Sequence, residues 1–354
     1  MNKIRIFLAA FIAVAFIFTS CEEDQRIVGK FENGALITNE GGWGATNASV
    51  SFLNYTTNAI EDNIYTHTNG RPLGDVLQSA YISNDKIFLV LNGSSKVEVA
   101  NISDITEVGT IEGINSPRYL TVANGNAYIT QWGDGGKVKV ANTTSFAITN
   151  TISVGKGPEG IIQTNGLIWV ANGGGLTVDS TISVINPTSN EVIKTIKLGN
   201  HNPKKLVVDK NGDIWALCYG YIKYKPDYSI EKETPSGLVK ISSTTKEVLK
   251  SFTISDNQHP MQLEISKNGQ TLYFGGGFGY TGIYAVDIAA TALPTTPLIN
   301  ASFYSFNVNP ANDDLYCLEA ISFTSAGKLK KYSSAGQLIE DYTVGIGPNG
   351  AIFQ

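Results

Sequence analysis

One phrase recurs seven times in this chain: a short apolar strand, a loop rich in Gly and Asn, and a second strand that ends in Asn, Asp or Ser. The apolar strands carry Leu36-Ile37, Ile87-Phe88, Ala127-Tyr128, Ile168-Trp169, Ile214-Trp215, Leu272-Tyr273 and Leu315-Tyr316. The second strands span residues 50–54, 97–101, 138–142, 182–186, 238–242, 283–287 and 329–333. Repeats of roughly 40 to 58 residues with β patterning and no helical period are typical of a β-propeller. The sequence therefore predicts an all-β fold with seven blades.

Each repeat can be divided into four strands, and the chain ends predict how the ring closes. Residues 350–354 form an inner strand with no partner after it, whereas residues 34–39 form a second strand with none before it. Pairing the two completes the seventh blade and removes two exposed sheet edges. Asn-Gly pairs at 124–125, 165–166, 211–212 and 268–269 predict tight hairpin turns with positive φ at both residues. The propeller is expected to span residues 34–354.

The direction of the strands predicts which loops share a face. Loops that contain Pro and precede an inner strand should lie on the same side as the Gly-rich loops that follow the next strand. We call this side the top face. An aromatic ring beside glycine has little apolar surface to pack against, and a polar-tipped ring suits a rigid binding surface. The rings expected to bind a ligand there are Trp43, Trp132, Tyr219, Tyr221, Phe278, Tyr280 and Phe323.

Few titratable residues are expected at the mouth of the ring. Glu40 and Glu319 belong to adjacent blades and could share a proton, hold a cation or act as an acid and base pair, or simply solvate the rim or pair with Arg71 or Arg118. His201 and His259 occupy equivalent loops of successive blades, but two histidines without a third strong donor do not predict zinc. We therefore expect no catalytic residues, metal or cofactor, and we include these four residues only in the expected ligand-binding face.

The N-terminus has the features of an export signal. Lys3 and Arg5 precede an apolar run over residues 6–18 that is short for a membrane span, and small residues then lead into Cys21. Residues 18–21 resemble a bacterial lipobox, which implies a signal peptide over residues 1–20 and lipidation of Cys21; a plain secretory signal is the alternative. Residues 22–24 resemble the acidic signal of surface lipoproteins of Bacteroidetes-type bacteria. The resemblance implies an acidic tether over residues 21–33 and an outer-membrane, cell-surface location with a lipid anchor in the membrane.

Charge and cysteine content exclude some partners and frameworks. Residues 1–20 hold two of the 26 basic residues and none of the 31 acidic ones, so the mature chain is mildly acidic. That balance argues against nucleic acid as a partner. Cys218 and Cys317 are the only other cysteines, and they are expected to be buried free thiols rather than a disulfide framework.

The repeats resemble a known class of propeller. Residues 167–173, 181–188 and 194–199, together with 127–160, look like the YVTN repeat of YncE-like propellers. Lipid-anchored relatives of similar size and leader include the BtuG-like cobalamin-binding proteins. That resemblance implies a corrinoid ligand on the top face and delivery to a TonB-dependent transporter. Because a fold does not fix a function, an adhesion or protein-docking module and, less favoured, a propeller lyase or hydrolase remain alternatives.

Overall fold

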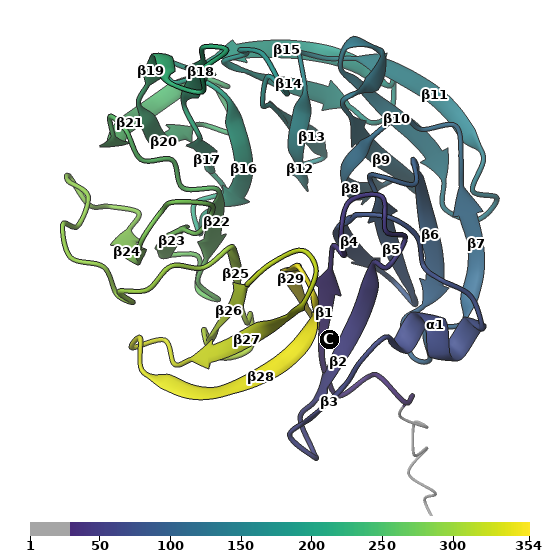
Figure 1. The fold of residues 1–354 in the computed structure, drawn as a ribbon. Coiled ribbons are helices and arrows are strands. Elements are labelled where there is room, and N and C mark those ends of the chain that lie inside the picture. Colours follow the sequence, from purple (N-terminus) through teal and green to yellow (C-terminus); the bar gives the residue numbers. More distant parts are fainter. Residues whose placement is uncertain (1–28) are drawn as a thin grey trace, which may run out of the picture.

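The computed structural model describes residues 29–354, so the expected signal peptide and Cys21 lie outside the described residues. Seven antiparallel sheets surround a central axis, and Figure 1 looks approximately along it. Each innermost strand contacts the innermost strands of both neighbouring blades, so the ring is complete. The predicted seven-bladed β-propeller is confirmed. Among residues 29–354, no helix is long and apolar enough to cross a membrane.

The first three blades after the N-terminal strands have four strands each, in inner-to-outer order. Blade 1 comprises β4 (Leu77–Ser83), β5 (Lys86–Leu91), β6 (Lys96–Asn101) and β7 (Glu107–Ile111). Blade 2 comprises β8 (Pro117–Ala123), β9 (Asn126–Gln131), β10 (Lys137–Asn142) and β11 (Ile148–Ser153), with the short 3-10 helix η1 (Gly133–Gly135) after β9. Blade 3 comprises β12 (Pro158–Thr164), β13 (Leu167–Asn172), β14 (Thr181–Asn186) and β15 (Glu191–Lys197).

Blades 4 to 6 follow the same plan with two departures, an added hairpin and a missing outer strand. Blade 4 comprises β16 (Pro203–Val208), β17 (Ile214–Cys218), β20 (Ser236–Ile241) and β21 (Val248–Ser255), and its insertion forms the separate hairpin of β18 (Tyr221–Tyr224) and β19 (Ile230–Thr234). Blade 5 comprises β22 (Gln262–Ile265), β23 (Thr271–Gly275) and β24 (Ile283–Asp287). Blade 6 comprises β25 (Ser305–Val308), β26 (Leu315–Glu319), β27 (Ala326–Tyr332) and β28 (Leu338–Ile346).

Blade 7 joins the two ends of the described chain. It comprises β29 (Pro348–Phe353), β1 (Gly34–Asn39), β2 (Ser49–Asn54) and β3 (Ala59–Glu61), and the six-residue helix α1 (Ile64–Asn69) leads from β3 to β4. In the register of β29 and β1, Ala351 faces Ile37 and Ile352 faces Leu36. The predicted closure is therefore confirmed. Phe31, just before β1, lies in the core against Phe52 of β2, with ring centroids 5.2 Å apart.

Blade 5 differs from the expected four strands. Its outer position is occupied by an irregular segment that forms one isolated β-bridge with the sheet, between Ile283 and Ile299. Pro294 and Pro297 lie in this segment, and proline has no N–H to donate to a neighbouring strand. The two prolines explain why the repeat lacks its outer strand here.

The hydrophobic core is divided among the blades. Buried apolar residues form seven clusters in the described chain, and each cluster joins two adjacent blades. Trp169 and Trp215 are among the largest fully buried side chains, as expected for the aromatic positions of the repeat. Cys218 and Cys317 are buried free thiols, as predicted, and burial raises the pKa of both well above the ordinary thiol value.

The Asn-Gly turns follow the prediction in two of four places. Both residues have positive φ at Asn124-Gly125 and Asn165-Gly166. At 211–212 and 268–269 only the glycine does. At 211–212, the Asp209 carboxylate accepts hydrogen bonds from the backbone N–H groups of Asn211 and Asp213. These bonds stabilise a turn that is longer than the predicted two-residue hairpin turn.

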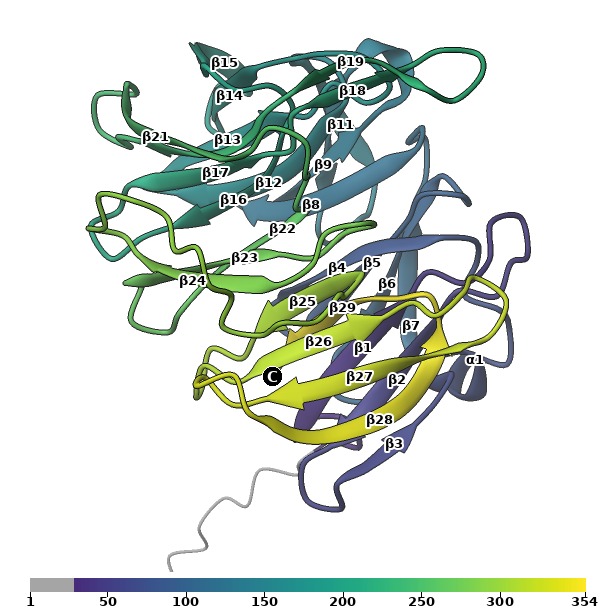
Figure 2. The same cartoon turned by 60° about the vertical axis from the view of Figure 1, so that its left-hand side comes forward.

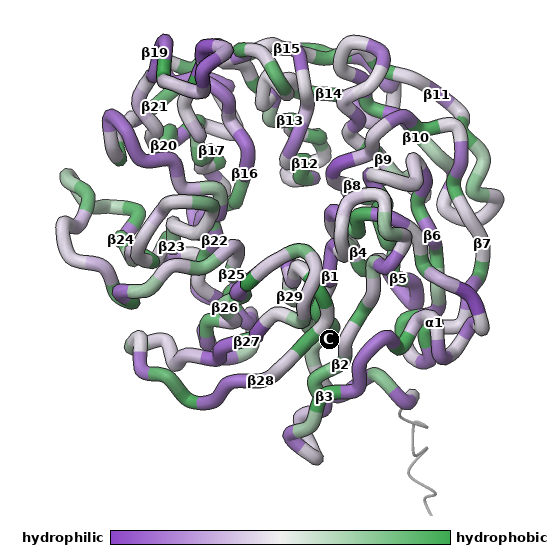
Figure 3. Tube along the Cα trace, in the orientation of Figure 1, coloured by the Kyte–Doolittle hydropathy of each residue, from purple (hydrophilic) through white to green (hydrophobic). Residues whose placement is uncertain are grey.

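The top face gathers the loops as expected from strand direction. The start of β29 pairs with the end of β1, where Pro348 faces Asn39, so the two loop types meet on one side. In Figure 2, the β18–β19 hairpin and the loop between β1 and β2 project toward that same side. The inner strands β8, β12 and β16 each begin with hydrophilic residues and continue with apolar ones, as the change from purple to green along β16 shows (Figure 3).

Candidate binding site at the mouth of the central channel

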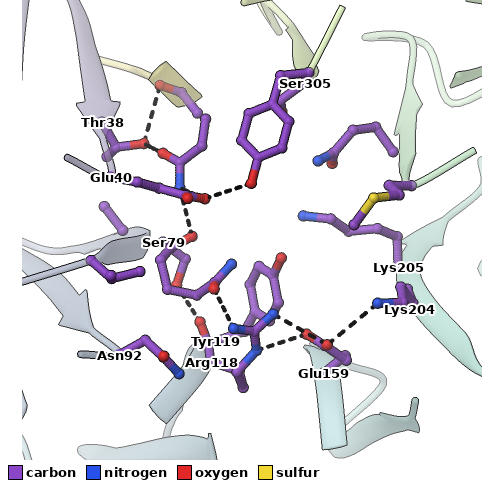
Figure 4. Close-up of a pocket in the computed structure, with 18 of the residues that line it drawn as sticks. Thr38, Glu40, Ser79, Asn92, Arg118, Tyr119, Glu159, Lys204, Lys205 and Ser305 are labelled. Atoms are coloured by element: carbon purple, nitrogen blue, oxygen red, sulfur yellow. Dashed lines mark hydrogen bonds and ion pairs between the residues drawn. The ribbon is translucent and has the colours of Figure 1, made fainter. Parts of the chain in front are cut away.

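A cavity of about 380 Å³ lies in the central channel and opens toward the top face. Its wall takes residues from all seven blades, mostly from the innermost strands. The polar contributors on which its chemistry depends are Glu40, Gln78, Arg118, Glu159, Lys204 and Lys205. In Figure 4, Glu40 lies on the side of the cavity opposite Lys204 and Lys205, and Arg118 and Glu159 lie between them.

A repeated backbone irregularity positions the polar residues. At the top of the inner strands of blades 7, 1, 2, 3 and 4, the inner strand holds one more residue than its partner. Such a β-bulge interrupts the alternation of side chains between the two faces of a strand. Two adjacent residues can then face the channel, and the adjacent pairs that line the cavity are Gln78-Ser79, Arg118-Tyr119, Lys204-Lys205 and Asn349-Gly350.

One wall is an ion-pair network built around a buried carboxylate. Glu159 is 2% exposed and accepts Arg118 Nε at 3.2 Å and Nη2 at 3.3 Å. Arg118 also donates to the Gln78 side chain, and its guanidinium lies over the Trp132 ring, 4.2 Å from the centroid. Burial lowers the pKa of Arg118, but Glu159 outweighs this and holds the pKa above its ordinary value. The guanidinium is therefore a fixed positive charge.

The opposite wall combines a carboxyl group with aromatic rings. Tyr304 Oη and Asn349 Nδ2 each donate to Glu40 Oε1 at 3.0 Å. Burial raises the pKa of Glu40, and these two hydrogen bonds lower it in part. The Tyr304 ring lies 4.9 Å from Phe278 and 5.7 Å from Phe323 between centroids. This wall therefore presents an apolar surface beside one acid group.

A second carboxyl group lies on the channel wall beside the lysines. Glu264 Oε1 accepts Asn307 Nδ2 at 2.8 Å. Burial raises the pKa of Glu264 to about 7, although the charge of Lys205 and this hydrogen bond act in the opposite direction. Glu264 is therefore a group whose charge changes near neutral pH.

The structure brings several of the predicted site residues to the cavity or its rim. Glu40 and Trp43 line the cavity, and the Trp43 side chain is 79% exposed. Phe278 and Phe323 lie on the rim through their contacts with Tyr304. Trp132 and Tyr219 support the cations Arg118 and Lys204, respectively, with their ring faces.

Other predicted site residues lie away from the cavity. Tyr280 is buried, because its ring packs edge-on against Tyr284, and it does not present a surface to a ligand. Glu319 pairs with Lys330 at 2.7 Å and is not part of the cavity wall. The two carboxyl groups of Glu40 and Glu319 are thus not brought together as an acid and base pair.

The remaining predicted residues surround the hairpin inserted in blade 4. His201 Nδ1 contacts Thr234 Oγ1 at 3.0 Å, and His259 Nε2 contacts Glu233 Oε1 at 2.9 Å. Tyr221 begins the hairpin in β18. Within residues 29–354, no cluster of three or more His, Cys, Asp or Glu residues has the arrangement needed to hold a metal ion.

The sequence was compared with known families and structures. A family model described as "Domain of unknown function (DUF5074)" matches residues 33–354. The chain belongs to the DUF5074 family. No curated protein matches the sequence.

Solved structures resemble this DUF5074 chain in fold. A quinonprotein alcohol dehydrogenase-like protein from Bacteroides thetaiotaomicron superposes with a TM-score of 0.67 at 16% identity, covering 91% of this chain and 78% of that one. Hydrazine synthase from Kuenenia stuttgartiensis gives a TM-score of 0.60 at 14% identity, covering 74% and 84%. A protein of unknown function from Desulfotomaculum acetoxidans gives 0.63 at 13% identity, covering 89% and 100%. At these identities the likeness concerns the fold alone.

Arg118, Lys204 and Lys205 of this DUF5074 protein are not among the residues predicted from sequence as ligand-binding. The signal was present in the Pro-containing loops, because the residue after proline enters the cavity in Pro117-Arg118, Pro158-Glu159, Pro203-Lys204 and Pro348-Asn349. The prediction instead followed the loops after the second strands, from which Glu40, Trp43 and Asn92 line the cavity.

Proposed function

We propose that this protein is a lipid-anchored binding protein of the outer-membrane surface that holds a small nutrient molecule over the top mouth of its central channel. The observation that carries the proposal is the cavity of about 380 Å³ to which all seven blades contribute. Concave sites with aromatic walls and a few convergent polar groups are typical of small-molecule binding.

A corrinoid is the specific ligand we propose, with delivery to a TonB-dependent transporter. A corrinoid is a large, flat molecule edged with amides, so it offers apolar area to the rings of Trp43 and Phe278. Its amides match hydrogen-bonding groups such as Glu40, which retains one carboxyl oxygen with no hydrogen bond among the described residues. The sequence resemblance to cobalamin-binding propellers and the lipobox-like segment before Cys21 support this proposal.

Docking of a protein partner is the second candidate, and one observation favours it. The most exposed large apolar side chains of the described chain all lie in top-face loops: Trp43, Leu176, Tyr228, Phe278 and Ile321, with exposed fractions from 64% to 91%. Clustered exposed apolar groups mark interaction surfaces more often than isolated ones do. A transporter and a corrinoid can share this face if the ligand lies at the mouth and the loops contact the partner.

Retention of cyanocobalamin through gel filtration tests the proposal. Wild-type protein is expected to elute with the red ligand, and Trp43→Ala with Phe278→Ala is expected to weaken binding at least about tenfold, because each exposed ring contributes stacking area. Leu249→Ala, on the outer strand β21, is the matched control, since Leu249 is also about half exposed (54%). Absence of retention by the wild-type protein would contradict the corrinoid proposal and favour protein docking.

A further inference from the structure

Two neighbouring lysines face the cavity, and neither ammonium group donates a hydrogen bond to any residue of the range 29–354. The bulge at the top of β16 turns Lys204 and Lys205 to the same side, where both line the cavity. Lys204 Nζ lies 3.7 Å from Glu159 Oε1, which is beyond hydrogen-bond distance. Lys205 Nζ has no carboxylate within 4.0 Å among residues 29–354. An ammonium group carries three donors, so this part of the wall has unused donor capacity.

Aromatic rings hold the two ammonium groups in place. Lys204 Nζ lies 5.0 Å from the centroid of Tyr219, and Lys205 Nζ lies 4.4 Å from that of Tyr119. The face of an aromatic ring attracts a cation. This attraction uses the N–H donors of the ammonium group less than a hydrogen bond to an anion does. The side chains are thus oriented in advance but remain able to bind an anion.

The nearby carboxylate does not neutralise both charges. Each oxygen of Glu159 accepts one hydrogen bond from Arg118, whereas Lys204 Nζ stays 3.7 Å from Oε1, so Glu159 pairs more closely with the guanidinium than with the lysine. Arg118 and Lys204 pair with Glu159, and Lys205 lies near Glu264, so three cations face two carboxyl groups on this wall. A narrow channel concentrates such an excess of positive potential at its mouth.

We infer that Lys204 and Lys205 form a subsite for an oxyanion, a carboxylate or phosphate group, carried by the ligand. This inference rests on the proposed function, because it assigns a chemical class to the ligand of the same cavity. Glu40 lies across the cavity from the lysines (Figure 4), and it accepts a hydrogen bond from Tyr304, whose ring contacts Phe278. The ligand class that fits both walls has an anionic group at one end and a flat, apolar body at the other.

Anion-dependent thermal unfolding tests the subsite directly. The unfolding midpoint is measured against increasing sodium phosphate or sodium citrate, with sodium chloride holding the ionic strength constant. A ligand that binds only the folded state raises the midpoint saturably. We expect a saturable rise for the wild type and for Lys194→Gln, an exposed lysine of β15. For Lys204→Gln/Lys205→Gln, we expect the apparent affinity to fall at least about tenfold, because charge-assisted hydrogen bonds are lost.

The response to each anion identifies the oxyanion group, and a variant that keeps both positive charges serves as a control. A response to phosphate alone assigns a phosphate subsite, and a response to citrate alone assigns a carboxylate subsite. Lys204→Arg/Lys205→Arg keeps the charge and is expected to retain the response. An equal response in the Gln variant, or no saturable response in the wild type, would overturn the inference.

Comparison with cyanocobalamin separates failure of this inference from failure of the proposed function. Equal corrinoid retention by the wild type and the Gln variant, with no anion response, would overturn the subsite and leave the binding protein intact. A saturable anion response without corrinoid retention would support the subsite and remove the corrinoid.

Discussion

Glu264 is a channel residue whose ionisation should make the folding stability depend on pH. Its carboxyl group lies among Lys205 and Asn307 on the channel wall, and burial raises its pKa to about 7 from an ordinary value of 4.5. Between these two values the folded protein binds a proton that the unfolded chain releases. Folding stability contributed by this group is therefore complete at low pH and decreases as the pH rises toward and through about 7.

Replacing Glu264 by Gln should remove this pH dependence. The free energy of unfolding of Glu264→Gln, relative to the wild type, is expected to rise from pH 5 to pH 8 by up to about 3 kcal/mol, because the pKa difference sets the size of the effect. Urea unfolding at both pH values measures it. Glu247→Gln, at an exposed carboxyl group, is the control and should show no such trend. A pH-independent difference for Glu264→Gln would show that Glu264 ionises normally in the folded protein.

At the same scale, the sequence predicted some site residues and not others for a physical reason. Trp43 and Phe278 were predicted because a large ring beside glycine has no strand neighbour to pack against, and both are exposed. Tyr280 also lies beside glycine, but its ring packs against Tyr284, a contact that the local sequence pattern does not predict. Lys205 belongs to a strand whose sequence shows no unusual feature. The β-bulge just before it explains why its side chain faces the cavity.

At the scale of elements, the strands were predictable and the irregularities were not. Aromatic strands such as β13 and β17 are revealed by short apolar runs between turn residues. A bulge adds one residue and leaves the apolar pattern of its strand readable, so it has no clear signal in one sequence. The bulges direct the polar side chains, which is why the fold was predicted more completely than the site.

Two histidines contact the base of the β18–β19 hairpin, and His259 makes two of these contacts. His259 Nδ1 faces the Tyr219 carbonyl and Nε2 faces the Glu233 carboxylate, so both ring nitrogens meet acceptors. The ring therefore links the backbone before the hairpin to a side chain of β19. Because Tyr219 also supports Lys204, the hairpin base is connected to the proposed anion subsite.

His259→Leu is expected to loosen this hairpin without unfolding the propeller. Loss of a hydrogen bond to a charged group should speed hydrogen exchange at residues 221–234 by about tenfold or more. Mass spectrometry of exchanged peptides measures the change, and the blade cores should retain their protection. His67→Leu, on α1, is the control. Unchanged exchange at 221–234 would show that His259 does not anchor the hairpin.

At the scale of the whole molecule, ring closure creates the cavity. The cavity wall includes Asn349 and Gly350 of β29 as well as Thr38 of β1, so it is complete only when the two ends of the described chain pair. The sequence predicted that pairing from the unpartnered strands at its two ends. The seven-fold arrangement then places the top-face loops around one mouth, where a ligand contacts several blades at once.

Calorimetric titration of cyanocobalamin into the wild type and Gln262→Trp tests the claim that this mouth is the binding site. Gln262 lines the cavity from blade 5, and its side chain makes no hydrogen bond among the described residues. The larger tryptophan side chain should therefore fill part of the cavity without breaking a hydrogen bond. Lys210→Trp, in an exposed turn at the opposite end of blade 4, is the control. We expect saturable one-site binding by the wild type and the control, and binding at least about tenfold weaker by Gln262→Trp, because occupied volume excludes the ligand. Equal binding by all three proteins, or no saturable binding by the wild type, would contradict the claim.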